Sequence, residues 1–155
     1  MNTMINWSIK AFNELTLEEL HDMIALRVAV FVVEQECPYQ DLDGKDKLSF
    51  HLLGKDNENN IVATLRILPK GVSYKEISIG RVVTAEKIRS WKKGHDLMKN
   101  AMYFISETYP KQNVRISAQT HLVNYYKKHG FDVTGKTYLE DGIPHSEMLF
   151  EFKEM

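Results

Sequence analysis

Ser78-Ile-Gly-Arg-Val-Val-Thr84 is the stretch of sequence from which the fold of this chain can be worked outward. Its isoleucine and valine residues favour a short β-strand. From Gly94 to Ile105, apolar residues recur at three- and four-residue spacing, which predicts an amphipathic helix. Between the two lies a basic turn, Arg89-Ser-Trp-Lys-Lys-Gly94. The sequence therefore predicts a strand, a cationic turn and a helix in direct succession.

The start of this predicted helix is a candidate anion site. The first amides of a helix lack partners within the helix, and the dipole places partial positive charge there. Both features favour a phosphate group, and the lysines of the turn would add charge. An ordinary strand-to-helix connection with lysines pointing into water explains the same residues. The turn alone leaves both interpretations open.

Composition and charge exclude several classes of protein. The chain has 155 residues, 43% hydrophobic and 26% charged, with a net charge of −1. These values predict a single domain spanning residues 1–155 and argue against nucleic-acid binding. Cys37 is the single cysteine, so no internal disulfide can form. The longest apolar run, Val28 to Val33, is too short to cross a membrane, and a leader pattern is lacking, so we expect a cytoplasmic protein with no membrane partner.

The N-terminal part of the chain predicts a strand, a helix and a loop. Residues 7–12 are a candidate first strand. Thr16 and Glu19 fit a capping box at the start of a helix that should end near Gln35. The polar residues of segment 34–47 predict a loop or a broken helix.

Alternation and turn residues predict the remaining elements. They are strands at 49–55, 61–68 and 114–118, a helix at 121–129 closed by Gly130, and a final hairpin of 131–138 with 143–152. Together these elements predict an α/β domain with a mixed central sheet flanked by helices. Histidines and cysteines do not occur at metal-ligating spacing, so we expect no metal.

Two motifs resemble those of the GCN5-related N-acetyltransferase (GNAT) superfamily. Arg89-x-x-x-x-Gly94-x-x-Leu97-Met98 is similar to the acetyl-CoA-binding motif, although Lys92 stands where its first glycine is expected. Tyr126-Lys-Lys-His-Gly130-Phe131 resembles the Tyr-x-x-x-Gly-Phe signature. The chain is most similar to the ElaA-like family, and the matching segments cover nearly its whole length: 26–35, 38–43, 79–83, 117–119 and 138–145.

The resemblance implies a single-domain GNAT acyl-CoA N-acyltransferase fold with acetyl-CoA as cosubstrate. In that family the backbone of the fourth strand pairs with pantetheine, and the loop before the helix holds the pyrophosphate. The residues that the resemblance assigns to acetyl-CoA are Val82, Val83, Thr84, Arg89, Lys93, Gly94, His95 and Gln119. Tyr126 stands where the family places the acid that protonates the departing thiolate. An aromatic ring packed under the C-terminal sheet is the alternative interpretation of Tyr126.

The base that would deprotonate the acceptor amine is less well defined. A lysine-like ammonium has a pKa near 10.4, so deprotonation at neutral pH costs roughly 4.6 kcal/mol. Many relatives use a glutamate on the fourth strand, where this chain has Ser78. Glu34 is the predicted base, with a plain helix-surface carboxylate as its alternative. His51, in an apolar strand, and Glu76 are further candidates. Loop residues could form an acidic acceptor pocket: Asp41, Asp43, Glu140, Asp141 and His145.

The sequence therefore predicts an N-acetyltransferase that moves an acetyl group directly from acetyl-CoA to a primary amine of a small molecule or peptide. An acyl-CoA-binding regulatory module with lost or weak turnover is the alternative, favoured by Lys92 and Ser78. The identity of the acceptor, the acyl-chain preference and the oligomeric state, a homodimer included, stay open.

Overall fold

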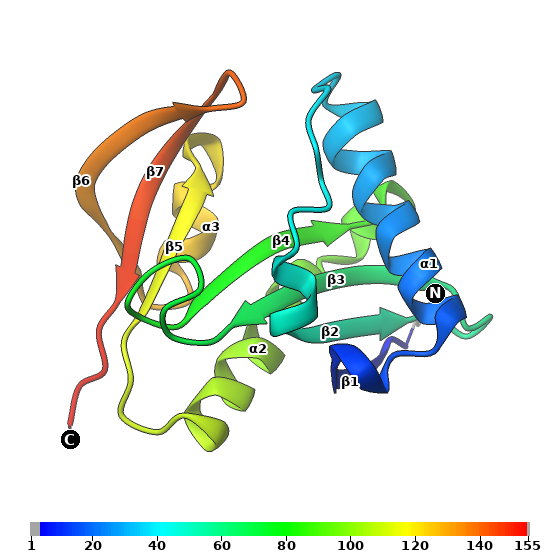
Figure 1. Ribbon diagram of the computed structural model, residues 1–155, viewed down its shortest axis with the longest axis horizontal. Helices are drawn as coiled ribbons and strands as arrows, with labels where there is room; N and C mark the ends of the chain where they lie inside the picture. The colour runs from blue at the N-terminus through cyan, green and yellow to red at the C-terminus, as the bar shows by residue number, and fades with distance from the viewer. Residues whose placement is uncertain (1–3, 155) are drawn as a thin grey trace.

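The computed structural model of the protein describes residues 4–154, so residues 1–3 and 155 of the domain predicted from the sequence lie outside it. The described chain forms two antiparallel sheets, with strand orders β1-β2-β3-β4 and β5-β7-β6 (Figure 1). The strands are β1 (Asn6–Ala11), β2 (Phe50–Lys55), β3 (Ile61–Leu68), β4 (Ser78–Thr84), β5 (Val114–Gln119), β6 (Phe131–Glu140) and β7 (Ile143–Phe150). The α-helices are α1 (Leu17–Arg27), α2 (Gly94–Thr108) and α3 (Val123–Lys127). None of the helices in this described part is long and apolar enough to cross a membrane.

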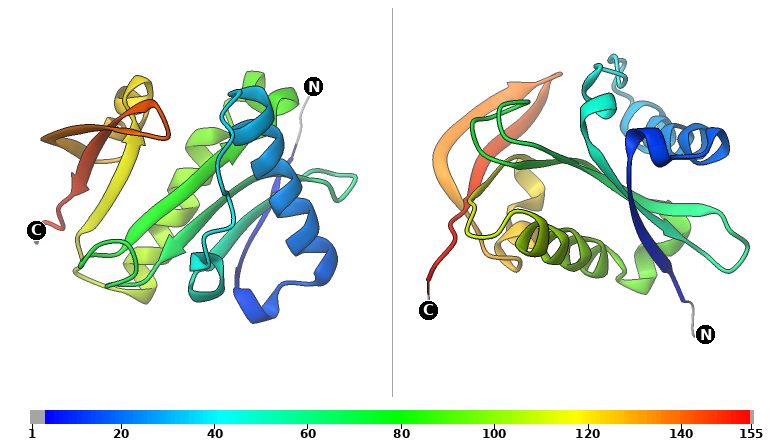
Figure 2. Two further views of the ribbon diagram at one scale, coloured as in Figure 1. Left: turned by 45° about the horizontal axis from the view of Figure 1, so that its top comes forward. Right: turned by 60° about the horizontal axis from the view of Figure 1, so that its bottom comes forward.

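Helices cover both faces of the first sheet. α1 lies on one face and α2 on the other (Figure 2). Under α1, Met23 packs with Leu53 and Ile61, whereas Leu97 and Met98 of α2 belong to the larger core on the opposite face. All eight residues of β3 are buried, because this central strand is covered on both sides.

The start of α1 follows the predicted capping box. The hydroxyl of Thr16 accepts from the backbone N–H of Glu19 at 3.0 Å, and the Glu19 carboxylate accepts from the N–H of Thr16 at 2.9 Å. Glu19 also accepts from Lys10 and Lys55. Burial opposes ionisation, but these hydrogen bonds prevail and hold the pKa of Glu19 at about 2. After Arg27 the chain continues as a π-helical segment, Val28–Glu34, so the helical run ends where it was predicted but is not α-helical throughout.

The two sheets meet at one point and then separate. Ile77 forms a parallel bridge with Val114, and the N–H of Arg115 donates to the carbonyl oxygen of Ile77 at 2.9 Å. Beyond this bridge β4 and β5 diverge, and within the described residues no ladder joins them. The edge of β4 that faces β5 therefore keeps backbone groups without a strand partner.

A bulge in β4 contributes to this separation. Thr64 of β3 pairs with Val83, yet Arg66 pairs with Gly80, so β4 has an extra residue over this interval. Arg81 lies inside the bulge with φ at +52°, which is unusual for a residue other than glycine. Such bulges bend a strand locally.

The C-terminal part differs in detail from the prediction. The helix expected at 121–129 is shorter, because Thr120–Leu122 forms a 3₁₀ turn before α3. Gly130 closes it as predicted, with φ at +92°. β7 lies between β5 and β6, so the final hairpin joins the second sheet through its last strand.

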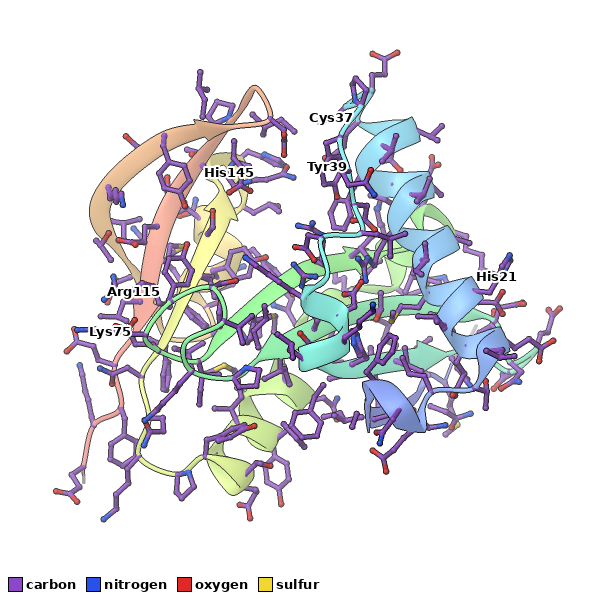
Figure 3. All side chains as sticks on the ribbon, viewed as in Figure 1. His21, Cys37, Tyr39, Lys75, Arg115 and His145 are labelled. Carbon is purple, nitrogen blue, oxygen red and sulfur yellow. The ribbon has the colours of Figure 1, made fainter. Side chains whose placement is uncertain are left out.

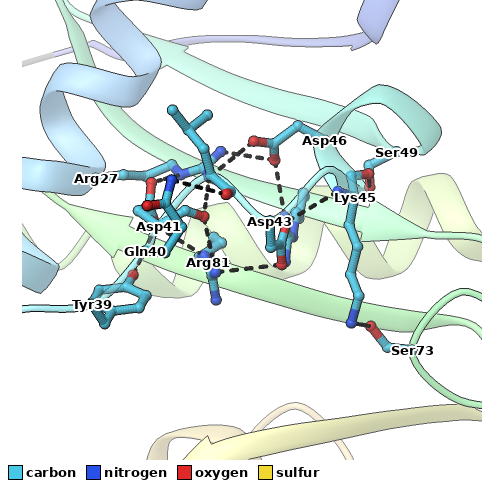
Figure 4. A network of polar contacts seen from close by, with 12 residues as sticks. Arg27, Tyr39, Gln40, Asp41, Asp43, Lys45, Asp46, Ser49, Ser73 and Arg81 are labelled. Carbon is cyan, nitrogen blue, oxygen red and sulfur yellow. Dashed lines mark hydrogen bonds and ion pairs between the residues drawn. The ribbon is translucent and has the colours of Figure 1, made fainter. Parts of the chain in front are cut away.

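A closed network of alternating charges holds the loop after α1 (Figure 4). We call it the Arg–Asp ring; in order around the ring it contains Arg27, Asp46, Arg66, Asp43, Arg81 and Asp41. Arg27 donates to both carboxylate oxygens of Asp46 at 2.9 and 3.0 Å, and to Asp41 at 3.0 Å. Arg66 donates to Asp46 at 3.0 Å. Arg27 is 1% exposed and Asp46 is 4% exposed, so these contacts lie away from solvent.

The other half of the ring lies nearer the surface. Arg66 donates to both oxygens of Asp43 at 2.8 and 2.7 Å. Nε of Arg81 lies 2.9 Å from the Asp41 carboxylate, and its Nη2 donates to the Asp41 carbonyl oxygen at 3.0 Å. The ring thus fastens residues 37–47, which we call the strap, to α1, β3 and β4.

We expect Asp46→Asn to destabilise the protein by about 3 kcal/mol, because it leaves Arg27 and Arg66 buried with too little negative charge. Urea unfolding at pH 7 measures the loss. Burial opposes ionisation, but hydrogen bonds from Arg27 prevail and keep the pKa of Asp46 below its usual 3.8. The difference between wild type and variant should therefore be full above pH 3.8 and shrink as the pH falls below it.

The exposed Asp22, whose carboxylate lies 3.1 Å from Nδ1 of His21 on the surface, provides the control for this substitution. Asp22→Asn should change stability by less than about 0.5 kcal/mol. Equal effects of the two substitutions would show that the Arg–Asp ring does not stabilise the fold.

Candidate active site

The separation of β4 and β5 opens a cleft of about 890 Å³. Both strands line it, and so do the π-helical segment, the strap and the turn between β6 and β7. Its walls come from segments far apart in the sequence, and its size is in the range of small-molecule and cofactor sites. The cleft is therefore the candidate active site.

The N-terminus of α2 lies at one end of the cleft. Gly94, the first residue of α2, lines the cleft and also a neighbouring hollow of about 380 Å³. Lys92 and Lys128 line this hollow, so cationic side chains gather beside the helix start. Tyr125 fixes the local backbone, since its hydroxyl donates to the carbonyl oxygen of Gly94. This end has the unpaired amides and positive charge that bind phosphate groups.

Lys92 adopts the backbone conformation that the missing glycine would adopt. Its φ is +57° and its ψ is +31°, in the left-handed region. This conformation costs a residue with a Cβ atom roughly 1 kcal/mol. The loop therefore keeps the geometry of a glycine at this position although the residue has changed.

Most residues assigned to acetyl-CoA by resemblance lie together. Six of them line the cleft: Val82, Val83, Thr84, Arg89, Gly94 and Gln119. His95 lines only the neighbouring hollow. Lys93 lines neither, and its ammonium lies 3.6 Å from the Asp96 carboxylate. The cations that face the hollow are instead Lys92 and Lys128.

Tyr126 lies on α3 and lines the cleft. It is 6% exposed, and its ring packs edge-on against Tyr125 and Phe131 with centroids 5.0 and 6.2 Å away. Burial raises the pKa of Tyr126, so its hydroxyl keeps its proton at neutral pH. Packing against the core and exposure to the cleft therefore coexist, and catalysis by Tyr126 stays a prediction.

The base candidates from the sequence have different surroundings. Glu34 lines the cleft, but Arg89 donates to both of its oxygens at 2.8 and 3.0 Å. These hydrogen bonds lower the pKa of Glu34 and make it a weaker proton acceptor. Its role as base stays a prediction that this ion pair does not favour. His51 is fully buried outside the cleft lining, with Nε2 2.8 Å from the Asp46 carbonyl oxygen, so it is a core histidine. Glu76 pairs with Arg115 at 2.8 Å and is also absent from the lining.

The acidic acceptor pocket expected from the loops is smaller than predicted. Asp41 and Asp43 have their carboxylates in the Arg–Asp ring, which neutralises them. Glu140, Asp141 and His145 do line the cleft. The acidic groups on this side that lie outside the Arg–Asp ring are therefore Glu140, at the end of β6, and Asp141, in the β6–β7 turn.

Three tyrosines that the sequence analysis did not single out lie at the cleft or beside its lining: Tyr39, Tyr74 and Tyr138. Tyr39 and Tyr74 line the cleft. The hydroxyl of Tyr138 donates to Ser117 of β5. Burial, and secondly the neighbouring Tyr138, raise the pKa of Tyr74. Tyr39 and Tyr138 fall in segments that resemble the ElaA-like family, 38–43 and 138–145, and the sequence carried no signal for Tyr74.

Two contacts bridge the cleft between the strap side and the second sheet. The side-chain amides of Gln35 and Gln119 exchange hydrogen bonds at 3.3 and 3.4 Å. The thiol of Cys37 donates to the carbonyl oxygen of Asp141 at 3.6 Å. Cys37 and Tyr39 lie on one side of the gap, and His145 lies on the other (Figure 3). The cleft is thus crossed by side chains rather than open along its whole length.

Comparison with known proteins identifies the class of protein that carries this cleft. A family model described as an acetyltransferase (GNAT) domain matches residues 15–152. The chain belongs to this GNAT family, whose fold binds acyl-CoA. ElaA of Escherichia coli K12 is 41% identical over 150 residues, covering 96% of this chain and 97% of that protein. UPF0039 protein sll0451 of Synechocystis is 42% identical over 146 residues, covering 94% and 95%.

Solved structures agree with this placement. The crystal structure of Escherichia coli ElaA matches with a TM-score of 0.89 and 40% identity, covering 96% of this chain and all of that one. An acyl-CoA N-acyltransferase from Pseudomonas aeruginosa matches with a TM-score of 0.87 and 39% identity, covering 93% and 98%. The predictions of the GNAT fold and of an ElaA-like family member are therefore confirmed.

We expect Lys92→Gly to stabilise the protein by about 0.5 kcal/mol. Glycine removes a left-handed strain of roughly 1 kcal/mol but adds freedom to the unfolded chain. Thermal and urea unfolding measure the change. Lys99→Gly, in the interior of α2, is the matched control and should cost about 1 kcal/mol. Destabilisation of both variants alike would mean that Lys92 makes contacts that outweigh its strain.

Proposed function

We propose that this protein transfers an acetyl group from acetyl-CoA to a primary amine of a small molecule or peptide by direct transfer. The observation that carries the proposal is the opening between β4 and β5, with an unpaired strand edge along one side. The start of α2 lies at its end and Tyr126 on its wall. Membership of the GNAT family supports the same reaction class.

The pyrophosphate and the pantetheine arm of acetyl-CoA need different binding sites, and the cleft has a suitable site for each. The pyrophosphate needs positive charge and free amides, which occur at Gly94 beside Lys92 and Lys128. The pantetheine arm carries amides that can pair with an open strand edge, and the edge of β4 from Val82 to Thr84 lines the cleft. Bound in this way, the cofactor would point its thioester toward Tyr126.

The reaction then needs one bond formed and one broken. The neutral amine attacks the thioester carbonyl carbon, the C–N bond forms, and the C–S bond breaks as the intermediate collapses. Negative charge develops on sulfur, whose conjugate acid has a pKa near 8.5. Tyr126 is protonated and lines the cleft, so it can donate a hydrogen bond or its proton to that sulfur.

The acceptor would enter from the side formed by the β6–β7 turn. Glu140 and Asp141 line that side and lie outside the Arg–Asp ring. Their charge attracts an ammonium ion, and the nearby tyrosine rings suit an alkyl chain or a cation. These features support a cationic primary amine as the acceptor.

Calorimetric titration with acetyl-CoA, followed by thiol release over a panel of amines, tests the whole proposal. The panel contains cadaverine, lysine amide and a tripeptide with a free N-terminus. Binding with turnover on at least one amine supports the transferase. Binding without turnover on any amine would instead favour the acyl-CoA-binding regulatory module, and absence of binding would exclude both.

We expect Gly94→Asp to weaken acetyl-CoA binding at least about tenfold, because a carboxylate would face the pyrophosphate at the helix start. Gly94→Ala is the steric control. A Cβ atom at this position would lie 3.6 Å from the Tyr125 ring, an ordinary contact, so alanine should bind nearly as well as wild type. Calorimetry on folded variants measures both affinities. Unchanged affinity in Gly94→Asp would remove the phosphate assignment.

We expect Tyr126→Phe to lower kcat by about 10²-fold while acetyl-CoA affinity stays nearly constant. The phenol acts only where charge develops on sulfur, so binding of the ground state should not depend on it. This loss is at the lower end for removal of a general acid, because proton transfer from a phenol of raised pKa to a thiolate is uphill. Phenylalanine keeps the packing with Phe131. A wild-type kcat in the folded variant would restrict Tyr126 to a packing role.

A further inference from the structure

The tautomer of His145 is fixed by its backbone neighbour. Nδ1 lies 2.8 Å from the carbonyl oxygen of Ile143. A carbonyl oxygen can only accept a hydrogen bond, so Nδ1 has to carry the hydrogen. The neutral ring therefore keeps its lone pair on Nε2. His145 lines the cleft and is 7% exposed.

The ring orientation is held from a second direction. His145 stacks on Tyr138 with ring centroids 6.2 Å apart and planes 12° from parallel. Tyr138 is itself anchored, since its hydroxyl donates to Ser117 of β5. β5, β6 and β7 place these residues through their register, in which His145 lies between Gln119 and Tyr138. The imidazole is thus preorganised rather than free to rotate.

A carboxylate lies beside the nitrogen that keeps the lone pair. Oε2 of Glu140 is 3.4 Å from Nε2 of His145, and its side chain is half exposed. A carboxylate in this place stabilises the imidazolium formed when Nε2 takes a proton, and it also attracts an arriving ammonium. The other ionisable groups around this corner are Tyr138 on β6, Asp141 on the turn and the thiol of Cys37 on the strap.

We propose that Nε2 of His145 accepts the proton of the attacking amine, and that Glu140 holds the ammonium beside it. This inference rests on the proposed acetyl transfer and names its base. R–NH₃⁺ gives one proton to Nε2 and becomes R–NH₂, which attacks the thioester carbon. The C–S bond breaks, the sulfur is protonated by Tyr126, and the amide nitrogen loses its second hydrogen to restore that phenol through water. His145 returns its proton to solvent.

His145 suits this role better than the carboxylates considered from the sequence. Arg89 engages both oxygens of Glu34, whereas Nε2 of His145 receives no hydrogen bond from any described residue. Its partner Glu140 carries the charge that a cationic substrate needs. The substrate class is therefore a primary alkylamine that arrives as an ammonium ion.

The test compares His145→Asn with His21→Asn, using cadaverine as the acceptor unless lysine amide or the tripeptide is the better substrate. Asparagine can still donate to the Ile143 carbonyl through its amide but offers no basic nitrogen. His21 is an exposed residue of α1, outside the cleft lining. We expect kcat/KM at pH 7 to fall at least about 10²-fold in His145→Asn and to stay unchanged in His21→Asn.

The pH profile separates proton acceptance from a structural role. Wild type and His21→Asn should show a pH-dependent limb in kcat/KM, and His145→Asn should lack that limb. Glu140→Gln should keep the limb, raise KM for the amine by a few-fold and leave kcat nearly unchanged. Nitrogen-15 NMR of the wild-type imidazole should show hydrogen on Nδ1 in the neutral form, and this measurement does not depend on a variant that folds.

Each outcome decides between the two proposals. An active wild type with an equally active His145→Asn and the same pH profile would overturn the role of His145 and leave acetyl transfer intact. An NMR result with the hydrogen on Nε2 of the neutral imidazole would also overturn the role of His145 and leave acetyl transfer intact. A wild type that binds acetyl-CoA but acetylates no amine of the panel would overturn both.

Discussion

Burying a guanidinium as deeply as that of Arg27 costs several kcal/mol unless carboxylates surround it. The strap supplies those carboxylates, and its own position depends on the arginines that bind them. The arginines and the strap therefore determine each other's position. Because charges alternate around the closed Arg–Asp ring, they cancel within the set. The ring thereby holds the strap over the cleft without adding net charge of its own.

Arg81 connects this network to the opening between the sheets. Its left-handed backbone lies in the bulge of β4, a conformation that costs of order 1 kcal/mol for a residue with a side chain. The contacts of Arg81 with Asp41 and Asp43 offset that cost. The same residue therefore maintains the bend that helps to separate β4 from β5 and the attachment of the strap.

Local patterns in the sequence were sufficient for most of the fold, because they depend on neighbouring residues. Thr16 and Glu19 marked the start of α1, Gly130 marked the end of α3, and the family motifs located the cleft. The pairing of charges was not predictable, because folding decides which opposite charges meet. Glu34 was the predicted base, but Arg89, 55 positions later in the sequence, donates hydrogen bonds to both oxygens of its carboxylate. Asp41 and Asp43 likewise form ion pairs with arginines that are distant in the sequence. The bulge at Arg81 could not be predicted, because no residue type in β4 indicates it.

The side chains that bridge the cleft have a consequence for the order of folding. Gln35 and Gln119 are 84 positions apart, and Cys37 and Asp141 are 104 apart. Contacts between such distant residues close large loops, and chain entropy opposes them until the elements between are in place. During synthesis the N-terminal wall emerges long before its partner, so the cleft can be completed only when nearly the whole chain is available. A shortened chain lacking the β6–β7 hairpin could retain the first sheet but would have no enclosed site.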